Sequence, residues 1–141
     1  MSLEKQLQNA FKQIQTAITD SLEDEVKLEG IKTMQNKVET VVVNAYTPRW
    51  YQRTGKLKEE CKGEMESVNI LKLYNDRHDE TTGKYIVPII ETGKGYFNTT
   101  LDDEIGPRPF IQATKESLQD GSVKSAMKEG LQKRLGKNAV F

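Results

Sequence analysis

The sequence predicts an α+β domain: two N-terminal helices, the second one long, packed on a small antiparallel sheet, with two C-terminal helices. Three observations predict this fold. Apolar residues recur at three- and four-residue steps over residues 3–18 and 31–45, they alternate along residues 57–74, and a second helical region lies between Pro109 and Gly136. A length of 141 residues fits one domain, 1–141, that can bury a core without a disulfide or metal.

The first helix is predicted over residues 1–20, where one stripe is apolar and the opposite face carries Lys, Gln and Thr. Such a helix buries only one face, which packs either on its own domain or on a neighbouring copy. The stripe consists of Leu3, Leu7, Ala10, Phe11, Ile14, Ala17 and Ile18.

The second helix is predicted to start near residue 21, because Asp20 followed by Glu23 has the spacing of a capping box. Gly30 is a weak point where this helix kinks or restarts. The helix runs to Tyr46 and ends at Pro48, since the residue before a proline avoids the helical region. The run of valines at 41–43 leaves a strand as the less favoured alternative.

The middle of the chain is predicted to hold the sheet. Gly55 suits a turn with positive φ, and Leu57 to Tyr74 then form two antiparallel strands with a turn near Glu66-Ser67. Residues 75–84 read as a polar loop. Residues 85–90, which contain Pro88, read as an edge strand or a single helical turn, and residues 92–108 as a long loop.

The C-terminal region is predicted to form two helices. Pro109 occupies the first helical position of one, and Gly121 ends it. Ser122 caps the other, which stops at Gly136. Residues 137–141 form a short tail.

Charge is balanced overall, with 21 basic and 21 acidic residues, and this argues against wholesale electrostatic binding to nucleic acid. It is not evenly spread, because residues 1–30 carry −3 and residues 107–141 carry +4. A subunit with such a dipole can stack head to tail, while two solvated helical faces that differ by chance are the favoured interpretation.

The chain offers little chemistry, because it has one cysteine and one histidine. Cys61 is expected to be a small buried group, and a Cys61–His78 nucleophile pair is disfavoured. The sequence lacks the ligand sets of zinc and calcium sites, and Gly93-Lys94-Gly95 lacks the spacing of a phosphate loop. We therefore expect no catalytic, metal or cofactor site. The absence of a signal-peptide core or a long apolar run also predicts no membrane association.

Four short motifs in order carry a family resemblance: Tyr46-x-Pro48, Arg53-Thr54-Gly55-x-Leu57, Tyr85 with Glu91-Thr92-Gly93, and Arg108-Pro109-Phe110. Over residues 25–135 this series resembles the neck or tail-completion proteins of long-tailed double-stranded DNA phages, the lambda-Z-like group. The resemblance implies a non-catalytic subunit, made in the host cytoplasm, that joins a homo-oligomeric ring in the virion. A ring of six is favoured. Its partners would be head-closure or connector proteins and tail-terminator or tail-tube proteins, with DNA loosely held in the channel.

The matched residues then acquire expected roles. Arg53 ties the junction together, Leu57 enters the core, Tyr85 and Glu91 lie beside the sheet, and Glu91 pairs with Arg53 or Arg108. Phe110 anchors its helix. For each of these residues, a role in holding the subunit's own fold is the favoured alternative. The sequence departs from the family at Val87–Gly93, where Pro88 stands, and in the long 93–106 loop, which is expected to be an interface or lumen-facing arm. Further contacts are expected at Trp50, Arg53 and the helical ends.

Two other functions stay open. One is a small nucleic-acid-binding module, and the other is an enzyme that uses Cys61 and His78. The first would use the basic C-terminal residues Lys124, Lys128, Lys133, Arg134 and Lys137.

Overall fold

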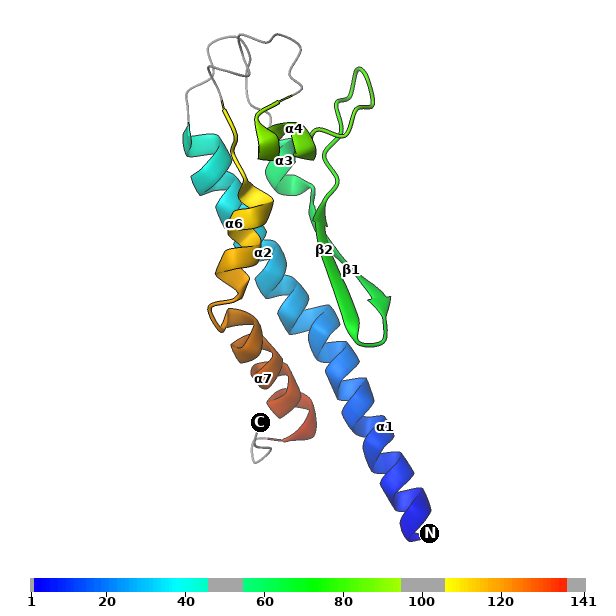
Figure 1. The fold of residues 1–141 in the computed structure, drawn as a ribbon. Coiled ribbons are helices and arrows are strands. Elements are labelled where there is room, and N and C mark those ends of the chain that lie inside the picture. Colours follow the sequence, from blue (N-terminus) through cyan, green and yellow to red (C-terminus); the bar gives the residue numbers. More distant parts are fainter. Residues whose placement is uncertain (1, 46–54, 95–105, 137–141) are drawn as a thin grey trace.

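The computed structural model describes residues 2–45, 55–94 and 106–136. A single long helical rod forms the spine of the molecule, with a β-hairpin on one side and two helices on another (Figure 1). The predicted α+β class is confirmed. Tyr46, Pro48, Trp50, Arg53 and Thr54, most of the 93–106 loop and the 137–141 tail lie outside the described residues.

The rod is continuous, so the predicted division into two helices near residue 21 is wrong. It runs through α1 (Leu3–Ser21), a π-helical turn at Leu22–Val26, α2 (Lys27–Lys37), a second π-helical turn at Val38–Val42 and a 3₁₀ turn at Val43–Ala45. Asp20, which would be the cap residue, lies inside α1, and the backbone stays helical through Ser21 and Leu22, whereas a capping box needs an extended residue at the cap. The Asp20–Glu23 spacing is therefore a surface feature of an unbroken helix.

The two π turns keep one face of the rod toward the core. Buried positions follow one another at steps of four, with a step of five inside the first π turn. In an α-helix of 3.6 residues per turn, each step of four overshoots by about 40°, and a wider π turn offsets that drift. The buried positions are Ala17, Ser21, Val26, Gly30, Met34, Val38 and Val42.

Gly30 is neither a kink nor a restart. It lies inside α2, where a β-carbon would overlap the methyl groups of Leu73 on the hairpin. The glycine is needed for close packing between the rod and the sheet, a contact between residues far apart in the sequence.

The hairpin pairs β1 (Cys61–Ser67) with β2 (Ile70–Asn75) antiparallel, with Cys61 opposite Asn75 and an irregularity after Met65. Two predicted boundaries shift. Leu57 belongs to a short helix, α3 (Lys56–Glu59), and the turn falls at 68–69 rather than at Glu66-Ser67. Gly55, with φ of 77°, confirms the predicted left-handed turn.

Three further helices complete the described fold. α4 (Val87–Thr92) confirms the helical alternative for the segment around Pro88. α6 (Phe110–Leu118) starts one residue later than predicted, with Pro109 at its N-cap. α7 (Ser122–Leu135) ends at Gly136 as predicted.

The predicted cap of α7 is wrong. The side chain of Ser122 makes no capping hydrogen bond, and its backbone N–H instead donates to the Asp120 carboxylate at 2.9 Å. Gly121, with φ of 105°, occupies the N-cap position itself.

The core gathers at the upper end of the rod, where α2, the hairpin base, α4 and α6 meet (Figure 1). Among the described residues, the lower end is formed by α1 and α7, which lie side by side (Figure 1). The total accessible surface is 9733 Å², whereas a compact monomer of 16.0 kDa has about 7,400 Å². Buried hydrophobic members of the core are Met34, Val38, Val42, Cys61, Val87, Ile90 and Phe110.

Candidate interaction surface

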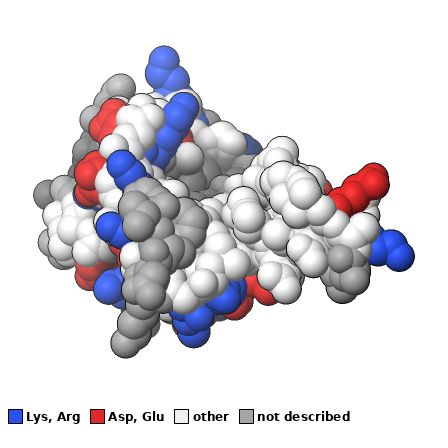
Figure 2. All heavy atoms as spheres, turned by 90° about the horizontal axis from the view of Figure 1, so that it is seen from below, with Lys and Arg blue, Asp and Glu red and all other residues white. Residues whose placement is uncertain are grey.

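The N-terminal part of α1, residues 3–14, projects beyond the rest of the molecule; we call it the arm. Its apolar side chains are exposed: Leu3 by 71%, Leu7 by 50%, Phe11 by 68% and Ile14 by 43%. Seen from below, the arm protrudes as a mostly uncharged surface with charged side chains toward its tip (Figure 2). Monomeric soluble proteins rarely expose contiguous apolar patches of this kind, and such patches often mark interaction sites.

The arm is nevertheless built as a regular helix. The Ser2 hydroxyl accepts a hydrogen bond from the Lys5 N–H at 3.2 Å and caps its start. A helix of about 12 residues is marginal in water by itself, because most helical stability comes from packing an apolar face. The arm therefore gains stability from any partner that covers its stripe.

The cover over the stripe begins at Ala17, where α7 packs against the rod. Gly130 allows the two helices to touch, since a β-carbon there would lie 2.6 Å from Ser21 Oγ. The Ser21 hydroxyl donates to the Ala17 carbonyl at 2.6 Å, so this buried polar group is satisfied. α7 ends at Leu135, and the stripe continues beyond it without cover from this helix.

Charged groups fasten the end of α7 to the first π turn. Arg134 donates to Glu25 Oε2 and to Asp24 Oδ2, each at 2.7 Å, and the Lys133 ammonium lies 3.7 Å from Glu25 Oε1. Burial alone would raise the pKa of Glu25. The Arg134 hydrogen bond and the charges of Arg134 and Lys133 outweigh burial, so the pKa of Glu25 is lowered.

These ion pairs bear on two expectations drawn from charge. The acidic N-terminal and basic C-terminal regions meet at this point within one chain, so head-to-tail stacking is not required to bring them together. Arg134 and Lys133, named for nucleic-acid binding, are engaged with Asp24 and Glu25. Basic side chains whose charge is already paired with carboxylates of the same chain are weak candidates for contacts with phosphate groups.

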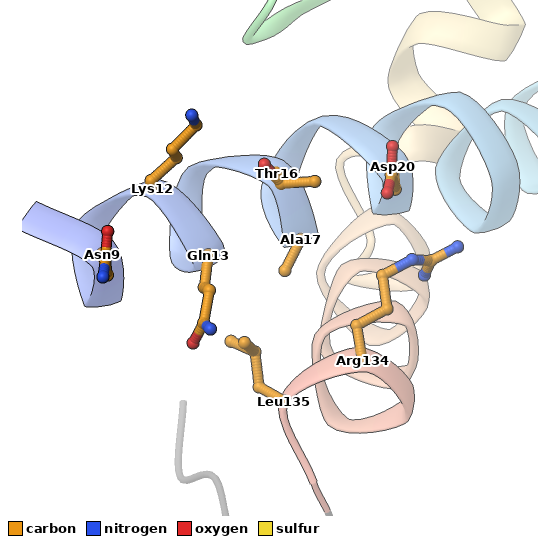
Figure 3. Close-up of a pocket in the computed structure, with 8 residues that line it drawn as sticks. All are labelled: Asn9, Lys12, Gln13, Thr16, Ala17, Asp20, Arg134 and Leu135. Atoms are coloured by element: carbon orange, nitrogen blue, oxygen red, sulfur yellow. The ribbon is translucent and has the colours of Figure 1, made fainter.

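A groove of about 680 Å³ opens between α1 and the end of α7, next to the base of the arm (Figure 3). Polar side chains from α1 form most of its wall, and Leu135 and Arg134 close the end at α7. This open groove marks the place where cover by α7 stops. Its lining is Asn9, Lys12, Gln13, Thr16, Ala17, Asp20, Arg134 and Leu135.

The motif residues that the structure describes lie far from the arm, around α4 and the start of α6. Phe110 is completely buried, as a residue that anchors α6 would be, and Leu57 packs against the edge of the core. The Tyr85 hydroxyl donates to the Asn75 carbonyl at 2.8 Å, at the end of the hairpin as expected. These contacts fit the alternative that the motif holds the subunit's own fold.

The partner of Glu91 among the described residues is a backbone group rather than the Arg108 side chain, and the proposed pairing with Arg53 lies outside those residues. Glu91 Oε1 accepts from the Ile111 backbone N–H at 2.5 Å, so it caps the first turn of α6. Burial raises the pKa of Glu91, although the N–H groups of Ile111 and Gln112 act in the opposite direction.

Gly93 and Arg108 close the base of the long loop. The Arg108 N–H donates to the Ile90 carbonyl at 2.8 Å, and a β-carbon on Gly93, whose φ is 69°, would overlap the Gly106 backbone. The chain thus leaves and re-enters the domain at the same point, and glycine is required there.

The two candidate reactive residues have other contacts. Cys61 is buried as predicted; burial raises the pKa of its thiol, and Asn75 donates to its sulfur at 3.4 Å. The His78 ring lies near Tyr85, with ring centres 5.1 Å apart, and its Nδ1 lies 2.9 Å from the Asp76 carbonyl. Within residues 2–45, 55–94 and 106–136, no three His, Cys, Asp or Glu side chains are grouped to hold a metal.

Sequence reasoning missed Glu25, Gly130 and Arg134 as a contact set between α1 and α7. The available signal was the glycine inside the α7 pattern, together with opposite charge at the two ends of the chain. The sequence does predict the apolar stripe of the arm, with a neighbouring copy as one of the two surfaces on which it packs.

Comparison with known proteins gives the family. A family model named YomN matches residues 5–133. The chain belongs to the YomN family. A YomN relative from Bacillus subtilis (strain 168), the SPbeta prophage-derived uncharacterized protein YomN, is 40% identical over 111 residues, which cover 75% of this chain and 76% of the relative.

The prophage derivation of that relative supports a phage origin for this YomN-family protein. No solved structure matches the chain. None of the helices in the described part of the chain has the length and hydrophobicity needed to cross a bilayer.

Proposed function

We propose that this YomN-family protein is a structural, non-catalytic subunit of a phage particle at the junction of head and tail. In this role it joins other subunits in a ring, six being favoured, around the DNA channel. It contacts head-closure or connector proteins on one side and tail-terminator or tail-tube proteins on the other. The prophage-derived relative supports the phage setting, and the ordered motifs support the place within the particle.

The observation that carries the proposal is the exposed stripe of the arm. Leu3, Leu7, Phe11 and Ile14 lie open to solvent on a helix whose remaining stripe is covered by other parts of the chain. An assembly subunit hides such a face against its neighbours. An enzyme would instead need reactive groups in a cleft, and the buried thiol of Cys61, with its raised pKa, is not an activated nucleophile.

The test is made in a phage that encodes the protein. After the gene is disrupted, electron microscopy of lysates is expected to show DNA-filled heads and complete tails that remain separate. Purified wild-type protein added to that lysate should restore joined particles, and the Leu7→Lys variant should not. Normal joined particles without the protein would overturn the proposal, as would its absence from purified virions by mass spectrometry.

The nucleic-acid alternative is tested by titrating DNA at several salt concentrations. Since Lys133 and Arg134 are engaged within the chain, we expect weak binding that disappears as salt rises. Tight binding with a steep salt dependence would favour the alternative.

A further inference from the structure

The apolar stripe of the arm has the spacing of a coiled-coil seam. Leu3, Leu7, Ala10, Ile14, Ala17 and Ser21 follow one another at steps of four and three, which is the alternation of heptad positions d and a. α7 covers the last two positions, and the first four remain exposed. The seam is therefore a helix–helix interface at its last two positions, and no second helix of the described residues covers its first four.

We propose that two copies of the free chain pair their arms antiparallel, each arm covering the exposed seam of the other. α7 runs antiparallel to α1 and stops at Leu135 (Figure 1). An antiparallel partner arm would run in the same direction as α7 and cover the seam from the place where α7 ends. The occupant of the stripe is thus the same stripe of a second copy, in an interface with twofold symmetry.

The register follows from which positions are open. In antiparallel coiled coils an a position of one helix faces a d position of the other. Pairing Leu3 with Ile14, and Leu7 with Ala10, uses only residues of the arm. The next register would place Leu3 against Ser21, which is fully buried under α7, and is therefore excluded.

A parallel pair conflicts with the fold. The partner's continuous rod would have to follow the seam past Ile14 to Ala17 and Ser21, where α7 already lies. The antiparallel pair avoids this conflict, since the partner's Leu3 stops at the level of Ile14.

The charges of the arm suit self-pairing. Lys5 and Lys12 fall at heptad position f, which points away from the seam, and Gln6 and Gln13 occupy the flanking g positions. No like charges therefore face each other across the dyad. At the other flanking position, e, the arm has one acidic residue, Glu4, and Phe11 one heptad later. With only Glu4 charged beside the seam, the stripe offers little to a strongly charged partner, and its own copy is the matching surface.

This inference concerns the free subunit and does not rest on its place in the phage particle. The dimer would keep the stripe covered until another partner takes its place. Failure of the dimer would leave the head–tail role untouched, because that role is tested in lysates.

The first experiment measures mass by light scattering and sedimentation over a concentration series. We expect reversible association from one 16.0-kDa chain to two. The dissociation constant should be on the order of 10–100 µM, since the interface is small. Leu7→Lys should weaken association at least about tenfold, because both copies lose a buried leucine. Gln8→Lys adds the same charge one residue away, off the seam, and should leave association unchanged.

A monomer at every concentration, a ring larger than a dimer, or a dimer that Leu7→Lys does not weaken would each overturn the proposal. Circular dichroism of both variants checks that the rod stays folded, which is expected because Leu7 is half exposed.

The second experiment fixes the orientation. Leu7→Cys and Ala10→Cys variants are made separately, mixed and oxidised; the natural Cys61 is buried. The antiparallel register predicts disulfides mainly between a Leu7→Cys chain and an Ala10→Cys chain. A parallel pair would give mainly disulfides between identical variants, and that result would contradict the proposal.

Discussion

The two halves of the long helix make the most instructive comparison in this molecule. From Ala17 to Val42 the stripe of the rod is buried by α7, the hairpin and α6, whereas from Leu3 to Ile14 the same stripe lies open. In both parts the positions of the stripe recur at steps of three to five residues. The periodicity of apolar residues thus predicts which face of a helix is buried. Whether that face is buried by the same chain or by a partner depends on the rest of the fold.

The largest contrast is expected between two phenylalanines. Phe110 is completely buried, so Phe110→Ala should destabilise the protein by about 3–5 kcal/mol. Phe11 is exposed on the arm, and Phe11→Ala should change stability by no more than about 0.5 kcal/mol. Urea unfolding of both variants in dilute solution measures the difference. Similar losses would mean that the arm is part of the monomer's core.

The ion pair at the boundary between the halves should have the next largest effect. Glu25→Gln removes the charge from the hydrogen bond that Arg134 donates to Glu25 and should cost about 1.5–3 kcal/mol at neutral pH. Because the pKa of Glu25 is lowered in the folded protein, the wild-type advantage is full above its ordinary value of 4.5. It disappears as pH falls through the lowered pKa.

Urea unfolding of wild type and Glu25→Gln at neutral and acidic pH tests this dependence. Lys133→Gln is the matched control; Lys133 is largely exposed, so its loss should cost less than about 1 kcal/mol. A Glu25→Gln effect that is the same at every pH would contradict the assigned role of its charge.

A substitution at Gly30 tests how closely the buried part of the rod is packed against the hairpin. Alanine favours a helix by about 1 kcal/mol over glycine, but its β-carbon would overlap Leu73, and overpacking costs about 1–3 kcal/mol. Gly30→Ala should therefore destabilise by roughly 1 kcal/mol. Combining it with Leu73→Val should remove that penalty, as a double-mutant cycle by urea unfolding would measure. Stabilisation by Gly30→Ala alone would mean that close packing does not decide this position.

The fold class, the apolar stripes and the glycine turns at Gly55 and Gly136 could be predicted from the sequence because they depend on local spacing and backbone conformation. The continuity of the rod could not, since the Asp20–Glu23 spacing is a local signal and the packing of α7 at Ser21 is not. The packing role of Gly30 could not be predicted for the same reason, because its contact Leu73 is distant in the chain. Glu91 was recognised as important, yet its backbone partner at Ile111 depends on how α4 and α6 meet.

The central claim is that the apolar stripe of the arm binds a helix of a second copy. Hydrogen exchange at increasing protein concentration tests it most directly. Amides of residues 26–42 should be equally protected at all concentrations, since the chain itself covers that half. Amides of residues 6–14 should exchange fast in dilute solution and become protected as concentration rises, except in Leu7→Lys. Arm protection that does not depend on concentration, or that is unchanged in Leu7→Lys, would contradict the account.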